Sequence, residues 1–390
     1  MRARSHIFMA GTTAPSHIYP SLALIRELAD RGHRVSYSVG QSLADLVAAA
    51  GAEPITHSSL LPASDSEWPE DPASAMRVFL DDQMAALPAL IARLDADRPD
   101  LVLYDIGGLA GPVLAARYGV PAVQLSPTLV AWDGYERDMA EMIEAVRNSE
   151  TGRSYHAAFR GWLAGNGIDA DPWQWQTHPE QVLSLIPRAL QPYADRVPAS
   201  VRFVGPCLDP ARLAETWTPP ADAGPVLLVS FGTAYTAQVP VYRAVLAGFG
   251  DSRWHVVLVI GDRVDPAELG PLPANVELHR RVPQPAVLAE AAAFVTHAGM
   301  GSCMEALWFG VPTVAIPQAV DQFGNAALLA ELGVGRHLPA EEVTAELLRR
   351  SVTEVAADPE VRARLRALSA EVRAAGGVER AVAAVESFLP

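Results

Sequence analysis

The sequence predicts an α/β protein built from two doubly wound parallel sheets that face each other across a cleft. Three observations lead to this fold class. Short apolar segments alternate with amphipathic ones, the pattern restarts after a proline- and glycine-rich stretch at 205–224, and 390 residues exceed what one hydrophobic core usually serves. Ligands of such sheets bind outside the carboxyl ends of the strands, so we expect the functional site in the cleft.

The first half begins with a strand at "SHIFMAG" and a loop at "TTAPSHIYP". An amphipathic helix follows, with Leu22, Leu24, Ile25 and Leu28 on one face, and "GHRVSYSV" is a second strand. "PDLVLYDIGG" and "GVPAVQLSP" predict two more strands, separated by a helix around 112–117. Such near-continuous apolar runs are typical of strands that are buried on both faces of a parallel sheet.

The second half repeats this pattern with "PVLLVSFGT", "WHVVLVIG", "VELHRRV", "AAFVTHAG" and "PTVAIPQ" as strands. Amphipathic helices are expected from Ala340 onward, and the C-terminal helix is expected to pack back on the N-terminal domain. We therefore predict two Rossmann-like domains at 1–205 and 225–390, joined by a linker at 206–224.

Composition excludes several classes of function. The formal net charge of −15 argues against nucleic acid as the main partner. Every basic residue is arginine, so the chain has no Walker A lysine and no lysine for a Schiff base. Two cysteines, Cys207 and Cys303, are too few for a disulfide framework or a four-thiolate zinc site. We find no apolar run of membrane-spanning length and no signal peptide, so a cytoplasmic protein is expected.

One segment, "THAGMGSCMEALWFGVPTVAIPQAVDQFGN", places glycines, a histidine and acidic residues at the start of a predicted helix. The helix is expected to begin near Ser302, which forms the capping-box pattern Ser-x-x-Glu with Glu305. Glycines let a phosphate approach the N–H groups of a helix N-terminus, and Glu305 is placed to accept hydrogen bonds from ribose. The segment predicts a nucleotide site; the alternative is that the box only closes a helix end. A nicotinamide site is disfavoured because Met304 stands where the fingerprint needs its third glycine.

"RVPQPAVL" followed by "FVTHAGMGSCMEALWFGVPTVAIPQAVDQFGNA" resembles the nucleotide-sugar signature of family 1 glycosyltransferases, which have the GT-B fold. Within this family the chain resembles the macrolide glycosyltransferases of antibiotic-producing bacteria over nearly its whole length. The resemblance implies that His297 and the backbone at 299–302 hold the diphosphate, Glu305 the ribose, and the Asp-Gln pair the sugar. The implied donor-binding residues are Thr233, Arg281, Val282, Gln284, His297, Gly299, Gly301, Ser302, Glu305, Asp321 and Gln322.

The chain departs from the family at Arg281, where relatives usually have tryptophan next to the base. A guanidinium plane can still stack on uracil or thymine. The choice between UDP and TDP therefore stays open.

The catalytic pair is expected on the N-terminal side. His17, in the loop after the first strand, is a candidate base because imidazole titrates near neutral pH, and Asp105 after "LVLY" is placed to orient it. The alternative for an isolated histidine is a surface or capping role. The resemblance implies the same pair, although Ser16 and Tyr19 replace the glycine and asparagine that related enzymes often have.

The absence of lysine also favours inversion, since retaining enzymes of this fold commonly use an arginine-lysine pair on the diphosphate. No metal or other cofactor is expected, because a helix N-terminus, backbone N–H groups and His297 can hold the leaving charge. The triplets Asp95–Asp97 and Asp169–Asp171 are expected to be solvated rather than metal-binding.

A large apolar pocket for the acceptor is expected from the less regular stretches 58–82 and 126–180. Core packing is the alternative for any one of their aromatic residues. The candidate acceptor residues are Trp68, Phe79, Trp132, Trp173 and Trp175.

Three hypotheses follow. The first is an inverting glycosyltransferase that moves a hexose, taken as glucose, from UDP to a hydrophobic alcohol such as a macrolide or a phenol, in antibiotic biosynthesis or resistance. The second is a nucleotide-sugar epimerase of the same fold, which needs no acceptor pocket. The third is a non-catalytic partner that binds a nucleotide, which the His17–Asp105 pair argues against. A homodimer is compatible with any of them.

Overall fold

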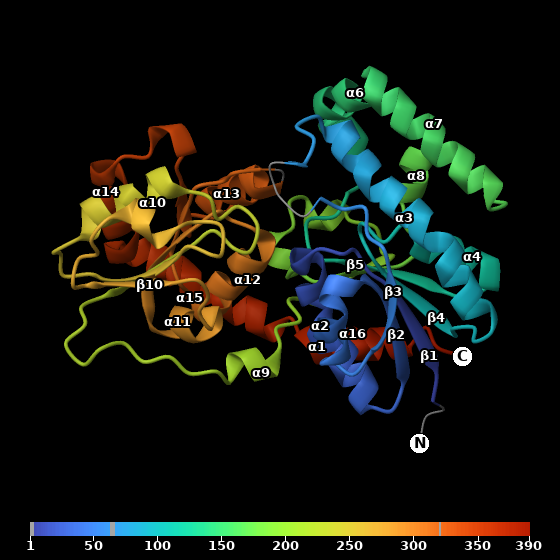
Figure 1. Ribbon diagram of the computed structural model, residues 1–390, viewed down its shortest axis with the longest axis horizontal. Helices are drawn as coiled ribbons and strands as arrows, with labels where there is room; N and C mark the ends of the chain where they lie inside the picture. The colour runs from blue at the N-terminus through green and yellow to red at the C-terminus, as the bar shows by residue number, and fades with distance from the viewer. Residues whose placement is uncertain (1–3, 63–66, 320) are drawn as a thin grey trace. The chain divides into compact units, whose positions relative to one another are not determined.

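The computed structural model describes residues 4–62, 67–319 and 321–390 (Figure 1). Contacts divide the chain into two compact units, Met1–Cys207 with Ala375–Pro390, and Leu208–Ala374. Each unit is built on a parallel sheet, which confirms the predicted fold class. These units differ from the predicted domain ranges in two places: Ala375–Pro390 belongs to the first unit, and most of the predicted linker, from Leu208 onward, belongs to the second.

The sheet of the first unit is parallel throughout and reverses its strand order between β1 and β4. Such a reversal leaves a crevice at the carboxyl ends of the two strands, where sheets of this kind bind ligands. In spatial order the strands are β3 (Glu53–His57), β2 (Arg34–Gly40), β1 (His6–Ala10), β4 (Leu101–Asp105), β5 (Ala122–Ser126), β6 (Val182–Ser184) and β7 (Val201–Phe203).

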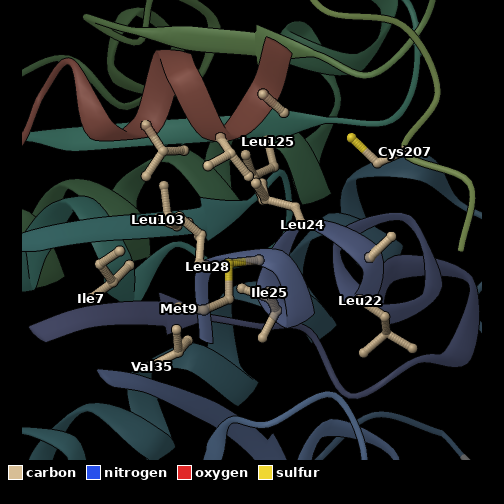
Figure 2. Close-up of a cluster of buried hydrophobic side chains, with 14 of the residues drawn as sticks. Ile7, Met9, Leu22, Leu24, Ile25, Leu28, Val35, Leu103, Leu125 and Cys207 are labelled. Atoms are coloured by element: carbon tan, nitrogen blue, oxygen red, sulfur yellow. The ribbon is translucent and has the colours of Figure 1, made fainter. Parts of the chain in front are cut away.

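Helices bury both faces of this sheet. Along β1, Ile7 and Met9 point into one core while Phe8 and Ala10 point into the other, as the period-two alternation of a strand requires. Figure 2 shows the first core, where Leu24 and Leu28 of α1 cover the sheet. The helices of the unit are α1 (Pro15–Asp30), α2 (Ala44–Ala48), α3 (Pro72–Asp95), α4 (Ala110–Tyr118), α5 (Tyr135–Asp138), α6 (Ala140–Asn148), α7 (Glu150–Gly165), α8 (Pro172–Thr177) and α16 (Gly377–Glu386).

The C-terminal helix α16 packs on α1, which confirms the prediction that it returns to the N-terminal domain. Val382 and Val385 are fully buried in the same hydrophobic core as Leu24 and Leu28. At the end of the helix, Glu386 Oε1 lies 3.5 Å from Arg31 Nη1 and 3.6 Å from His33 Nε2. The last helix is thus part of the core that supports β1.

The stretches 58–82 and 126–180 are more regular than the sequence analysis expects. Helix α3 begins inside the first, where the Asp71 side chain accepts a hydrogen bond from Ser74 N and Pro72 opens the helix. Helices α5 to α8 occupy much of the second. Residues 63–66 of the first stretch lie outside the described residues.

The second unit repeats the architecture with a parallel sheet whose strand order reverses between β8 and β11. Its strands in spatial order are β10 (Val276–His279), β9 (His255–Val259), β8 (Val226–Ser230), β11 (Ala291–Thr296), β12 (Thr313–Ala315) and β13 (Gly335–His337). Its helices are α9 (Pro210–Leu213), α10 (Val239–Phe249), α11 (Gln284–Glu290), α12 (Met300–Phe309), α13 (Asp321–Glu331), α14 (Ala345–Ala357) and α15 (Pro359–Ala374). Across the described ranges, we find no helix whose length and apolar character would allow it to span a membrane.

Candidate active site

His17 and Asp105 meet at the carboxyl ends of β1 and β4, where the first sheet reverses its order. His17 Nδ1 lies 2.8 Å from Asp105 Oδ2, so the carboxylate can hold the ring in the tautomer that leaves Nε2 to accept a proton. His17 lies in the first turn of α1 rather than in a loop, because Pro15 already opens the helix. Its side chain is 22% exposed and that of Asp105 only 3%, so the carboxylate is shielded while the imidazole is partly accessible.

Two neighbours that the sequence analysis does not single out hold Asp105 in place. Thr12 Oγ1 donates to Asp105 Oδ2 at 2.6 Å and Gly107 N donates to the same oxygen at 3.0 Å. A Cβ at Gly107 would stand 2.5 Å from Thr12 Oγ1, so only glycine fits there. Burial raises the pKa of Asp105, but His17 and the hydrogen bonds of the three partners outweigh it and leave the pKa below its usual range. The aspartate is therefore a carboxylate that can stabilise an imidazolium.

Two of the predicted acceptor residues gather beside this pair. The ring centroids of His17 and Phe79 lie 5.9 Å apart, and those of Trp68 and Phe79 lie 5.0 Å apart. Phe79 is carried by α3. Aromatic rings thus flank the imidazole of His17.

The other three aromatic residues lie elsewhere in the first unit. Trp132 packs against Tyr135 and Tyr193, with ring centroids 4.9 and 4.8 Å apart. Trp173 and Trp175 lie on α8 rather than in a loop, and both pack against the core formed with α3, α4 and α7. The structure does not bring these three next to His17.

In the second unit, His297 follows β11, directly at the reversal of the strand order. Glycines frame its ring: a Cβ at Gly232, in the loop after β8, would stand 2.7 Å from Cε1, and one at Gly299 would stand 2.5 Å from Nε2. Burial lowers the pKa of His297 to about 4, so the ring is neutral at pH 7. Without a ligand, the ring can meet an anion through an N–H group.

The helix α12 begins earlier than the capping-box pattern predicts. Its N-cap is Gly299, and Ser302 lies inside the helix, so the predicted box does not form. The carboxylate of Glu305 turns instead to neighbouring segments, with Gln284 Nε2 2.7 Å from Oε2 and Arg212 Nη1 3.0 Å from Oε1. At Gly301 a Cβ would meet no protein atom within 4 Å, so packing within the protein does not require this glycine.

The Asp-Gln pair opens α13, with Asp321 exposed and Gln322 buried. One amide group ties this helix to the His297 segment: Asn325 Nδ2 lies 3.0 Å from Asp321 Oδ2 and 3.0 Å from the carbonyl oxygen of Ala298. Ala298 has a φ of 62°, in the left-handed region. This conformation is energetically unfavourable for any residue that has a side chain. The sequence analysis does not single out Asn325, which lies at the end of the quoted signature.

The remaining predicted donor residues surround the same edge of the second sheet. Thr233 is exposed in the loop after β8, and Val282 packs against the hydrophobic core between α11 and α12. Arg281 is 83% exposed, and its Nη2 lies 2.7 Å from Asp262 Oδ2 at the end of β9. The guanidinium thus forms an exposed ion pair near the strand ends and is not buried.

The similarity to known glycosyltransferases extends over nearly the whole chain, and a family model matches its second half. A family model described as "Erythromycin biosynthesis protein CIII-like, C-terminal domain" matches residues 243–385. The oleandomycin glycosyltransferase of Streptomyces antibioticus is 48% identical over 392 residues, which cover 99% of this chain and 91% of that protein. The chain belongs to the family 1 glycosyltransferases with the GT-B fold.

Other relatives of this glycosyltransferase agree. The NDP-glycosyltransferase YjiC of Bacillus licheniformis is 34% identical and covers 98% of both chains. The crystal structure of the glycotransferase of kitacinnamycin superposes with a TM-score of 0.92 at 42% identity, covering both chains completely. The calicheamicin glycosyltransferase CalG4 has a TM-score of 0.87 at 34% identity, over 99% of this chain and 98% of its own. All of these are named transferases, so no observation favours an epimerase.

The aspartate triplets of the glycosyltransferase have structural partners. Asp95 pairs with Arg117, with Oδ2 and Nη2 2.9 Å apart, and Asp97 pairs with Arg34. Asp171 caps α8 and lies 2.9 Å from His156 Nε2. Within residues 4–62, 67–319 and 321–390, we find no group of three or more His, Cys, Asp or Glu residues suited to a metal ion.

Because the ring of His297 is buried, the glycosyltransferase should become less stable as the pH decreases. Its pKa is about 4 when folded and about 6.5 when unfolded. The unfolded chain therefore takes up the proton first, and stability is lost as pH falls from about 6.5 to 4. Urea unfolding should show that the free energy of unfolding decreases between pH 7 and pH 4, and that this decrease is larger by about 3 kcal/mol in the wild type than in His297→Gln. An equal decrease in both proteins would contradict a buried, uncharged ring.

Proposed function

We propose that this glycosyltransferase moves glucose from UDP-glucose to a hydroxyl of a hydrophobic natural product, such as a macrolide or a phenol, with inversion at the sugar carbon. The observation that carries the proposal is the His17–Asp105 pair beside Phe79, which joins a base to an apolar surface. The second unit supplies the proposed donor residues around His297 and Glu305.

The chemistry is a single displacement. The acceptor oxygen forms a bond to the anomeric carbon of the sugar while the bond from that carbon to the diphosphate breaks. The acceptor proton passes to His17 Nε2, and the carboxylate of Asp105, held by Thr12 and Gly107, stabilises the resulting imidazolium. The diphosphate leaves toward the N–H groups at the start of α12 and the neutral ring of His297. A chain without lysine favours this inverting route.

Relatives support the donor and acceptor classes. Two Bacillus relatives are named NDP-glycosyltransferases, at 34% and 33% identity, and a third, at 26%, is named a UDP-glucosyltransferase. The names of other relatives refer to oleandomycin, kitacinnamycin and calicheamicin. We therefore infer a natural-product acceptor and a role in antibiotic biosynthesis or self-resistance, in the cytoplasm and without a metal.

Incubation with UDP-glucose and a panel of macrolides and phenols tests the proposal. Mass spectrometry should detect the addition of one hexose, and the proton coupling at the anomeric carbon should report a β-linkage from the α-linked donor. Parallel reactions with TDP-glucose and with other UDP-hexoses test the donor. Retention of the α-configuration, or release of an altered sugar nucleotide without any acceptor, would overturn the assignment.

Arg281 provides a prediction about the base. If its guanidinium replaces the family's indole as the stacking surface, Arg281→Trp should preserve or improve UDP affinity, and Arg281→Ala should weaken it by about 0.5–2 kcal/mol. A charge effect on the diphosphate shrinks as salt rises, whereas stacking persists. Calorimetric titrations of uridine, UMP and UDP at low and high salt separate the two. Equal uridine binding by the wild type and Arg281→Ala would contradict stacking.

A further inference from the structure

We propose that Arg212 is a positioning residue of the nucleotide site: it holds the Glu305 carboxylate ionised and aimed, so that both oxygens can accept hydrogen bonds from ribose hydroxyls. The inference rests on the proposed binding of the donor ribose at Glu305. It assigns a role to a segment that the sequence analysis treats only as a linker.

The geometry leaves the carboxylate one acceptor position on each oxygen for a ligand. Arg212 Nη1 lies 3.0 Å from Oε1 and Gln284 Nε2 lies 2.7 Å from Oε2. A carboxylate oxygen has two lone pairs, so each oxygen can accept one further hydrogen bond. Ribose presents two adjacent hydroxyls, which match two acceptor oxygens held in a fixed plane.

Arg212 is itself fixed by local structure. It lies on α9, whose N-cap Asp209 accepts a hydrogen bond from Ala211 N at 2.9 Å. Helix α9 packs against α11, which begins with Gln284. The two nitrogen partners of the carboxylate are thus held on neighbouring helices, while Glu305 comes from a third.

Burial makes this arrangement necessary. Glu305 is 5% exposed, and burial raises its pKa above the usual range; Arg212 and Gln284 oppose this rise but do not cancel it. Arg212 is the charged partner that acts on the carboxylate; the neighbours Gln284 of α11 and Ser302 of α12 are polar but uncharged. A protonated Glu305 carries an O–H donor and loses one of its acceptor positions, so it no longer matches two hydroxyl donors.

The first experiment measures the Kd for UDP by calorimetry from pH 6 to pH 9 in the wild type and in Arg212→Gln. Without the guanidinium the pKa of Glu305 rises, so the variant should bind UDP about tenfold more weakly at pH 6 and approach the wild type as pH rises. Taking the ratio of the two Kd values cancels the titration of the UDP phosphate itself. Arg336→Gln is the matched control, because it removes an exposed arginine, paired with Glu354, from the same unit.

A double-mutant cycle with Glu305→Gln separates an action through Glu305 from direct attraction to the diphosphate. In the Glu305→Gln background, Arg212→Gln should raise the Kd for UDP by less than about twofold, because no carboxylate remains for Arg212 to position. The Arg212 side chain is 38% exposed, so the variant should fold, and its melting temperature is the check. A pH-independent loss that persists in the Glu305→Gln background would overturn the role proposed for Arg212, as would equal affinities at every pH. A wild-type protein that binds neither UDP nor TDP would overturn the donor assignment and this inference with it.

Discussion

His17→Ala should lower kcat by about 10²–10⁴-fold, the usual contribution of a general base, while the affinity for UDP stays unchanged. The reason is geometric: His17 belongs to the first unit and is held by Asp105, whereas the proposed donor residues lie in the second unit. Rates at saturating acceptor, combined with calorimetry of UDP, measure the two quantities separately. Full activity of His17→Ala on a hydroxyl acceptor would show that another group is the base.

Asp105→Asn should lose as much activity as His17→Ala or less, because the side chain keeps its shape but no longer carries the charge that stabilises the imidazolium. The chain offers a matched control in a second histidine-aspartate pair of the same unit, His156 with Asp171, whose Nε2 and Oδ2 lie 2.9 Å apart. His156→Ala removes an imidazole paired with a carboxylate far along the chain from the strand ends of β1 and β4. It should leave kcat unchanged within about a factor of two.

The sequence predicts the strands, and the placement of His17 and Asp105 at neighbouring strand ends, because both depend on local patterns. Runs such as "HIFMA" and "LVLYD" are apolar on both faces, and a parallel sheet is the structure that buries both. Residues that follow such strands gather at one edge, which is why His17 and Asp105 are found before any coordinates are known.

Tertiary partners explain what the sequence could not predict. Thr12 is one of several polar residues after β1, and only the fold aims its hydroxyl at Asp105. The Ser-x-x-Glu pattern fails because α12 already begins at Met300, which places Ser302 inside the helix, and the Glu305 carboxylate contacts Gln284 and Arg212, which are distant along the chain. The periodicity of helix α3 is hidden by interrupting polar residues and the internal Pro88, although Asp71 and Pro72 mark its start.

The frame around His297 gives the last prediction. Gly232→Ala should lower kcat/KM for the donor by about 10²-fold, because the new Cβ would stand 2.7 Å from Cε1 of the buried ring and displace it. Gly232 also has a φ of +73°, so alanine is strained there whatever the ring does. Gly119, at the end of α4 in the first unit, is the matched control: its φ is +68°, in the left-handed region, and a Cβ there meets nothing within 4 Å.

Both variants should therefore lose a similar, small amount of stability from backbone strain, about 1–2 kcal/mol, measured by urea unfolding. Only Gly232→Ala should lose donor turnover. In a His297→Ala background the ring is absent, so Gly232→Ala should cost little further activity. If Gly119→Ala impairs turnover as much as Gly232→Ala does, or if the Gly232→Ala loss persists without the ring, then backbone strain rather than the position of His297 governs the donor site.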